Sequence, residues 1–222
     1  TLHVALLCQL MAQRSGWPAE RMLSLVKAAL TMNMAIVDLQ GRFAAMGRLS
    51  EGQRDQIRAH PQVAVDRMRA AGVSDAVWLG AVLQHHERPG GGGYPRDLKQ
   101  VDALADALRL ADVFMAKISA RAERAPLPIQ DAARQMFHES HGSPAAAAII
   151  KEYGIYPPGN FVMLASGEMA VVIRRGATAH TPVAAAITDA SGRPVLRPTQ
   201  RDTAQPAHAT QAPAADQPTV QR

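Results

Sequence analysis

The sequence predicts a mainly α-helical bundle, followed by a small antiparallel β extension and a disordered C-terminal tail. Apolar residues recur at three- and four-residue steps up to about residue 153, which is the periodicity of helices with one buried face. After that point, residues 161–176 and 182–198 each have the pattern of two strands around a Ser-Gly turn. The last segment lacks aromatic residues, leucine, isoleucine and methionine, so it cannot offset its ordering entropy by burial. The expected divisions are a helical domain at 1–153, a β extension at 154–198 and a disordered tail at 199–222.

Composition narrows the class of protein. The chain has 222 residues, 47% of them hydrophobic, which is enough for one full core. Its nearly uncharged apolar runs are far shorter than the roughly 20 residues that span a bilayer, so membrane insertion is not expected. The single cysteine, Cys8, fits a reducing compartment, and the net charge of +5 comes from scattered arginines without the basic run of a nucleic-acid-binding arm. We expect a fragment of a longer cytoplasmic protein that binds no nucleic-acid polymer.

Proline, serine and glycine mark the expected helix ends. One helix should start after Pro18, since proline is tolerated in a first turn. Ser50 is a candidate N-cap for a helix to about His60, where Pro61 either ends this helix or opens the next. Ser74 should cap a helix that continues into a loop of four glycines between two prolines. The other expected helices are one that buries Leu104, Ala107, Leu108, Ala111 and Phe114, and two shorter ones at about 129–138 and 144–153.

The densest cluster of chemically active side chains is Gln84-His85-His86-Glu87, where that helix meets the glycine loop. Imidazoles are the commonest side-chain ligands of transition metals. Neighbouring residues of a helix point about 100° apart, so both histidines can serve one site only if that site lies over the helix end. The alternative is that they are solvent-exposed or capping histidines.

His60 and Asp112 are compatible with the same composite site. Asp112 lies beside the apolar stripe of its helix, where a carboxylate tends to be partly buried and needs a partner. The alternatives are an interaction of His60 with a helix dipole and an ion pair between Asp112 and Arg109. The glycines Gly90–Gly93 could hold phosphate through backbone N–H groups, or could form a plain flexible loop.

These residues resemble the signature of the HD-GYP family of phosphohydrolases, which hydrolyse cyclic di-GMP. The eleven residues from His85 to Pro95 (HHERPGGGGYP) are similar to the family's central motif. Leu108–Phe114 (LRLADVF) resembles a family helix that contains Ala-Asp, and Arg121 falls where the family has an arginine. The resemblance implies an HD-type helical bundle, and it implies metal-dependent cyclic di-GMP phosphodiesterase as the activity of the family.

The sequence departs from the family at the His-Asp dyad, where it has Met32 and Asn33. In the family the dyad aspartate bridges two iron- or manganese-type ions, which together activate the attacking water. Asparagine offers one neutral oxygen, and methionine offers a soft thioether that binds such ions poorly. A two-metal centre is therefore not expected. The residues left for one iron or manganese ion are His60, His85, His86 and Asp112.

Three functions remain open, and the first is the one we favour. The chain is a degenerate domain that binds cyclic di-GMP or a protein, and a GGDEF domain is the protein partner that the resemblance implies. The second function is that of a residual phosphohydrolase that uses one metal ion. The third function is a structural or dimerisation domain of a larger signalling protein, with no ligand. A homodimer is a further possible assembly. The expected ligand-binding residues are Arg88, Gly91, Gly93, Tyr94 and Arg121.

Overall fold

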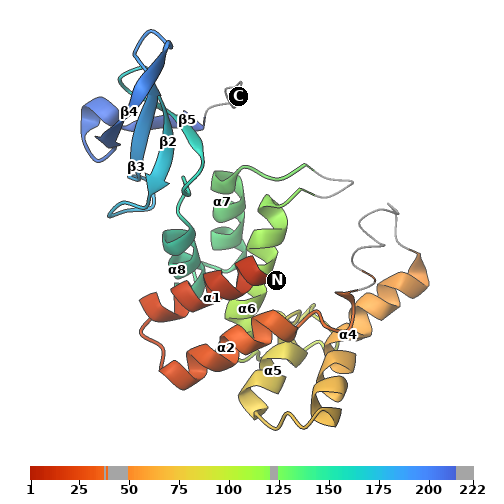
Figure 1. Cartoon of the computed structure of the whole chain (residues 1–222). Helices are drawn as coiled ribbons and strands as arrows, with labels where there is room; N and C mark the ends of the chain where they lie inside the picture. The colour runs from red at the N-terminus through yellow and green to blue at the C-terminus, as the bar shows by residue number, and fades with distance from the viewer. Residues whose placement is uncertain (38, 40–49, 121–124, 214–222) are drawn as a thin grey trace. The chain divides into compact units, whose positions relative to one another are not determined.

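A computed structural model describes residues 1–37, 39, 50–120 and 125–213 of the chain (Figure 1). The chain divides into two compact units, Thr1–Ile149 and Ile150–Arg222. The first unit is helical, and the second contains the β-sheet. None of the helices in the described ranges combines the length and the apolar character that a membrane crossing requires.

The helical unit is organised around α6, which packs against α1, α2, α5 and α7. The apolar stripe expected on this helix, from Leu104 to Phe114, is buried. The predicted helical bundle is therefore confirmed. The helices are α1 (Leu2–Arg14), α2 (Ala19–Thr31), α4 (Glu51–Ala70), α5 (Ala76–Gln84), α6 (Ala103–Ile118), α7 (Ile129–Glu139) and α8 (Pro144–Tyr153), the last of which crosses the boundary between the units.

Helix α4 begins where the sequence predicts but does not end there. Ser50 and Gln53 form a capping box, in which the Ser50 hydroxyl accepts from the Gln53 amide at 3.3 Å and the Gln53 side chain accepts from the Ser50 amide at 2.8 Å. Contrary to the prediction, Pro61 neither ends nor opens a helix, because it lies buried inside one helix of 20 residues. Beyond it Val65 and Met68 continue the same buried face, and this packing outweighs one missing backbone hydrogen bond.

Helix α5 differs from the prediction at both ends. Its N-cap is Asp75 and not Ser74, because the Asp75 carboxylate accepts from the Trp78 amide at 3.0 Å and from the Ser24 hydroxyl at 3.0 Å. The Trp78 hydrogen bond is the main reason why the pKa of Asp75 is lowered. The helix ends at Gln84. The two histidines that follow therefore lie in a turn, so the 100° offset between neighbouring residues of a helix does not apply to their side chains.

The second unit is a five-stranded antiparallel sheet with the strand order β4-β3-β2-β1-β5. The two predicted hairpins are present as β1–β2 and β3–β4. Val162 lies opposite Ala170, and the buried residues alternate along the first two strands. The strands are β1 (Phe161–Leu164), β2 (Met169–Arg174), β3 (Val183–Thr188), β4 (Pro194–Asp202) and β5 (Thr210–Pro213).

Residues 199–213 differ from the expectation of a disordered tail. Strand β4 continues to Asp202, and β5 pairs with β1 so that Val162 lies opposite Pro213. The buried Thr203 hydroxyl also donates to the Pro182 carbonyl at 2.6 Å. Backbone pairing at a sheet edge orders this polar segment, and composition does not reveal such pairing. The rest of the expected tail, 214–222, lies outside the described residues.

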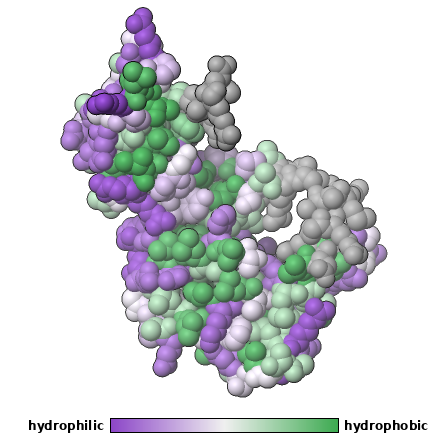
Figure 2. All heavy atoms as spheres, viewed as in Figure 1, coloured by the Kyte–Doolittle hydropathy of each residue, from purple (hydrophilic) through white to green (hydrophobic). Residues whose placement is uncertain are grey.

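Helices α1 and α2 keep large apolar side chains at the surface, and Figure 2 shows apolar residues gathered over these helices. Exposed apolar surface of this kind is typical of contacts with other proteins. The homodimer expected from the sequence stays a prediction. The exposed side chains are Leu2, Leu6, Leu23 and Leu30.

Candidate metal centre

His60, His85 and His86 converge in the helical unit. One ligand atom from each lies within 4.8 Å of the others. The Nε2 atoms of His60 and His85 are 3.1 Å apart, and the ring centroids of His85 and His86 are 4.1 Å apart. His60 comes from α4, whereas the other two follow α5, and these two helices pack together. The expected composite site at the end of α5 therefore contains all three predicted histidines.

Backbone carbonyls orient two of the three rings. The Nδ1 atom of His60 donates to the Ile57 carbonyl at 2.5 Å, and that of His85 donates to the Val82 carbonyl at 2.6 Å. A carbonyl oxygen can only accept, so each Nδ1 carries the hydrogen and each Nε2 presents a lone pair. Two acceptors thus face each other, an arrangement that a bound cation stabilises.

Burial keeps these imidazoles in the form that binds metal. Desolvation lowers the pKa of His60, and it lowers the pKa of His85 to about 3 and that of His86 to about 2. Ligand nitrogens about 2.1 Å from one ion and at right angles to each other would lie about 3 Å apart. The separation of 3.1 Å between the His60 and His85 Nε2 atoms fits two ligands of a single transition-metal ion.

Asp112 is not part of the tight group that the three histidines form within the described residues. It lies half-buried on α6, and its charge adds to burial in raising the pKa of Cys8 and of Tyr94. Arg109, which the sequence offered as a partner for Asp112, forms an ion pair with Asp106 at 2.7 Å. Asp112 therefore stays a predicted ligand.

Glu87 anchors the glycine loop, a role that the sequence analysis missed. Its fully buried carboxylate accepts from the Arg96 amide at 2.7 Å and from the Leu98 amide at 3.0 Å. The loop returns so closely that a Cβ on Gly93 would lie 2.5 Å from the Glu87 Cα atom. The sequence did carry a signal for this role, because Glu87 directly follows two candidate ligands. A carboxylate that is buried with them needs several hydrogen-bond donors, and the loop amides supply them.

The glycine amides are engaged within the loop, which corrects the idea of a phosphate cradle at three of the four glycines. These three amides are therefore not available to hold a phosphate. The bonds are Gly90 to the Lys99 carbonyl at 3.0 Å, Gly91 to the Arg88 carbonyl at 2.9 Å and Gly92 to the Asp97 carboxylate at 2.5 Å.

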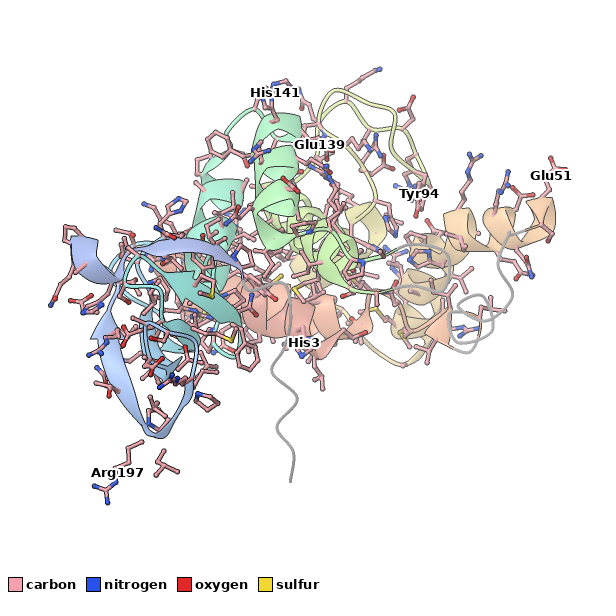
Figure 3. The ribbon with its side chains drawn as sticks, turned by 90° about the horizontal axis from the view of Figure 1, so that it is seen from above. His3, Glu51, Tyr94, Glu139, His141 and Arg197 are labelled. Atoms are coloured by element: carbon pink, nitrogen blue, oxygen red, sulfur yellow. The ribbon has the colours of Figure 1, made fainter. Side chains whose placement is uncertain are left out.

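The other predicted ligand-binding residues are placed unequally. The Tyr94 ring, labelled in Figure 3, stacks on His86 with centroids 4.4 Å apart and planes 24° apart. Arg88 is exposed, and its charge contributes to the lowered pKa of His86. Arg121 lies outside the described residues. His141, which Figure 3 shows apart from Tyr94, is exposed and does not belong to the histidine group.

The residues at the dyad positions lie at the end of α2. Met32 is fully buried, and its amide donates to the Ala28 carbonyl at 2.8 Å. Asn33 is half-buried in the turn that follows, and Ile36 is buried beyond it. Met32 and Ile36 are therefore core residues.

The helical fold and its histidine centre define a class of protein. Residues 2–142 match the HD domain family, and the chain belongs to that family. It is similar to "Cyclic di-GMP phosphodiesterase PA4108" from Pseudomonas aeruginosa, with 33% identity over 141 residues, 61% of this chain and 34% of that protein. The chain thus spans about a third of the length of that relative. The solved structure of "Bd1817, a HDG"Y"P protein from Bdellovibrio bacteriovorus" shares the fold with a TM-score of 0.52 and 18% identity, covering 66% of this chain and 49% of that one.

Proposed function

We propose that this chain is a degenerate HD-GYP-type domain that acts in cyclic di-GMP signalling as a binding or interaction module, without hydrolysing the nucleotide. The observation that carries the proposal is the full burial of Met32 at the first dyad position. A thioether in the core supplies no charge and is a poor ligand for hard ions. Asn33 beside it is neutral, so the bridging carboxylate of a two-ion centre is missing as well.

The three histidines would hold one iron or manganese ion, with Asp112 as the predicted fourth ligand. A bound ion of this kind supplies a Lewis acid that polarises a phosphate oxygen. His60 and His85 would contribute Nε2 lone pairs, and their Nδ1 bonds to carbonyls would keep the rings aligned. Hydrolysis in the family uses a bridged pair of ions, and losing one member of such a unit usually lowers the rate by several powers of ten.

Nucleotide binding can persist without hydrolysis. Arg88 presents an exposed guanidinium close to His86, and guanidinium contacts to phosphate do not depend on a bridged metal pair. The relative named above is a cyclic di-GMP phosphodiesterase, which favours this nucleotide over other phosphoesters as the ligand. Arg121 and a GGDEF protein partner belong to the same proposal, as does a cytoplasmic location.

The test measures turnover and binding separately. The full chain is incubated with cyclic di-GMP and either Mn²⁺ or Fe²⁺, and the linear dinucleotide is followed against time by chromatography. We expect no product above the protein-free control. Calorimetric titration should show binding that Arg88→Gln weakens about tenfold, because one charged phosphate contact is lost. The matched control is Arg69→Gln, which changes an exposed arginine near the C-terminal end of α4 and should leave binding unchanged.

The intact histidine group favours one alternative, a residual phosphohydrolase with a single ion. Metal-dependent turnover by the unmodified chain that disappears in His60→Ala would establish this alternative and refute the proposal. The Met32→His, Asn33→Asp double variant restores the family's dyad and shows whether the rest of the site still supports hydrolysis. Absence of both turnover and nucleotide binding in the unmodified chain would point to a structural domain.

A further inference from the structure

A proline inside α4 leaves one backbone carbonyl without its helical donor. In an α-helix the amide of residue 61 would donate to the carbonyl of Ile57, four residues earlier. Residue 61 is Pro61, which has no N–H group, and α4 nevertheless continues from Glu51 to Ala70. The Ile57 carbonyl instead accepts a hydrogen bond from the Nδ1 atom of His60 at 2.5 Å.

The second histidine is held by the same kind of bond, at a helix end. His85 donates from Nδ1 to the carbonyl of Val82, again three residues earlier. The helical donor for that carbonyl would come from residue 86, but α5 ends at Gln84. The end of α5 leaves the Val82 carbonyl available for His85, and Pro61 leaves the Ile57 carbonyl available for His60.

We infer that Pro61 is a positioning residue for the metal centre. By withholding an N–H group from the Ile57 carbonyl, it reserves that carbonyl for His60 and keeps the hydrogen on Nδ1. The Nε2 lone pair of His60 then faces the Nε2 atom of His85 at 3.1 Å. Hydrogen bonds that orient a ligating histidine typically change metal affinity by about 10- to 100-fold. The inference rests on the proposed ion site.

Restoring the missing amide tests the inference in the full chain. Pro61→Ala supplies an N–H group that competes with His60 for the Ile57 carbonyl. We expect its affinity for Zn²⁺, measured by calorimetric titration, to fall at least tenfold. Pro61→Val restores the same amide while filling more of the buried volume, so it should lose affinity to a similar degree. Gly52→Ala changes the same helix at a site with open space around the new Cβ, and it should bind like the unmodified chain.

Hydrogen exchange follows the competition directly. The backbone amide that Pro61→Ala introduces should be protected in the metal-free protein, and saturating Zn²⁺ should reduce its protection as His60 reclaims the carbonyl. Wild-type affinity in Pro61→Ala, with Ile57 accepting both bonds, would overturn the role of Pro61. Wild-type affinity in Pro61→Val alone would assign the loss to packing and would also overturn it. Zn²⁺ binds nitrogen ligands more tightly than Fe²⁺ or Mn²⁺ does, so an unmodified chain that binds no Zn²⁺ would refute the ion site itself.

Discussion

The two units of this protein each bury a polar cluster, and the clusters are satisfied in opposite ways. In the β unit, the Glu168 carboxylate accepts from the Ser166 hydroxyl at 2.7 Å and from two nitrogens of Arg201 at 2.7 and 3.0 Å. Donors and acceptors match there, apart from the Nδ1 atom of His208, which lies 3.8 Å from the same carboxylate and has no hydrogen-bond partner among the residues that the structure describes. In the helical unit, His60 and His85 turn two acceptors toward each other.

The difference separates a structural cluster from the candidate metal centre. A carboxylate held by a guanidinium is complete by itself, and Arg201 lowers the pKa of Glu168 to about 2. Neutral imidazoles with facing lone pairs need an external cation to complete them. Two buried acceptors that face each other are therefore a better guide to a binding site in this chain than a buried polar group as such.

The largest expected effect comes from removing a ligand. His85→Ala or His86→Ala should weaken Zn²⁺ binding at least 100-fold, because two imidazoles hold an ion far less well than three. Calorimetric titration of the full chain measures this loss. His138→Ala, an exposed histidine on α7, should bind normally. Unchanged affinity in His85→Ala would break the comparison, since the facing acceptors would then have no role in binding.

Metal should stabilise one unit and not the other. At a free Zn²⁺ concentration 100 times the Kd, the free energy of unfolding of the helical unit should rise by about 2.7 kcal/mol. Trp17 and Trp78, the two tryptophans of the chain, both lie in this unit and report its unfolding by fluorescence. Hydrogen exchange of the β2 and β3 amides should stay unchanged, and equal protection of these strands would contradict the assignment of the ion to the helical unit.

The β cluster should respond to substitution and to acid. Glu168→Gln should lower the free energy of unfolding of the β unit by about 2 kcal/mol, because charge-assisted bonds to Arg201 are lost. The folded-state pKa of about 2 lies below the ordinary 4.5, so the stabilisation is present above about pH 4.5 and disappears as the pH falls toward 2.

Hydrogen exchange of β2 and β3 measures both effects. Arg201→Gln should reproduce the destabilisation, whereas Arg197→Gln, exposed on the same strand, should not. Acid sensitivity that survives in Glu168→Gln would mean that another carboxylate governs this unit.

The smallest expected effect concerns local helix stability. Ser50→Ala removes half of the capping box of α4 and should reduce the free energy of unfolding by about 1 kcal/mol. Zn²⁺ affinity should stay within twofold of the unmodified value, because Ser50 lies ten residues before His60 on the same helix. A parallel loss of affinity would show that fraying of α4 reaches the metal centre.

Local rules predicted much of this protein from sequence. The spacing of apolar residues located the central helix, serine marked the start of α4, and Ser-Gly turns located both hairpins. These features depend on residues a few positions apart, whose preferences a single sequence displays. The same reasoning named all three histidines, because their chemistry is visible without coordinates.

Long-range packing decided the rest. It carried α4 through Pro61, ended α5 before His85 and added β5 to a sheet edge beside β1. It also assigned Glu87 to the loop amides and turned the two Nε2 atoms toward each other. Each of these outcomes depends on which backbone carbonyl or amide is left without a backbone hydrogen bond once the chain has folded. Proline and glycine spacing indicates where the backbone departs from regular structure, but only the tertiary structure determines which side chain meets the group left open there.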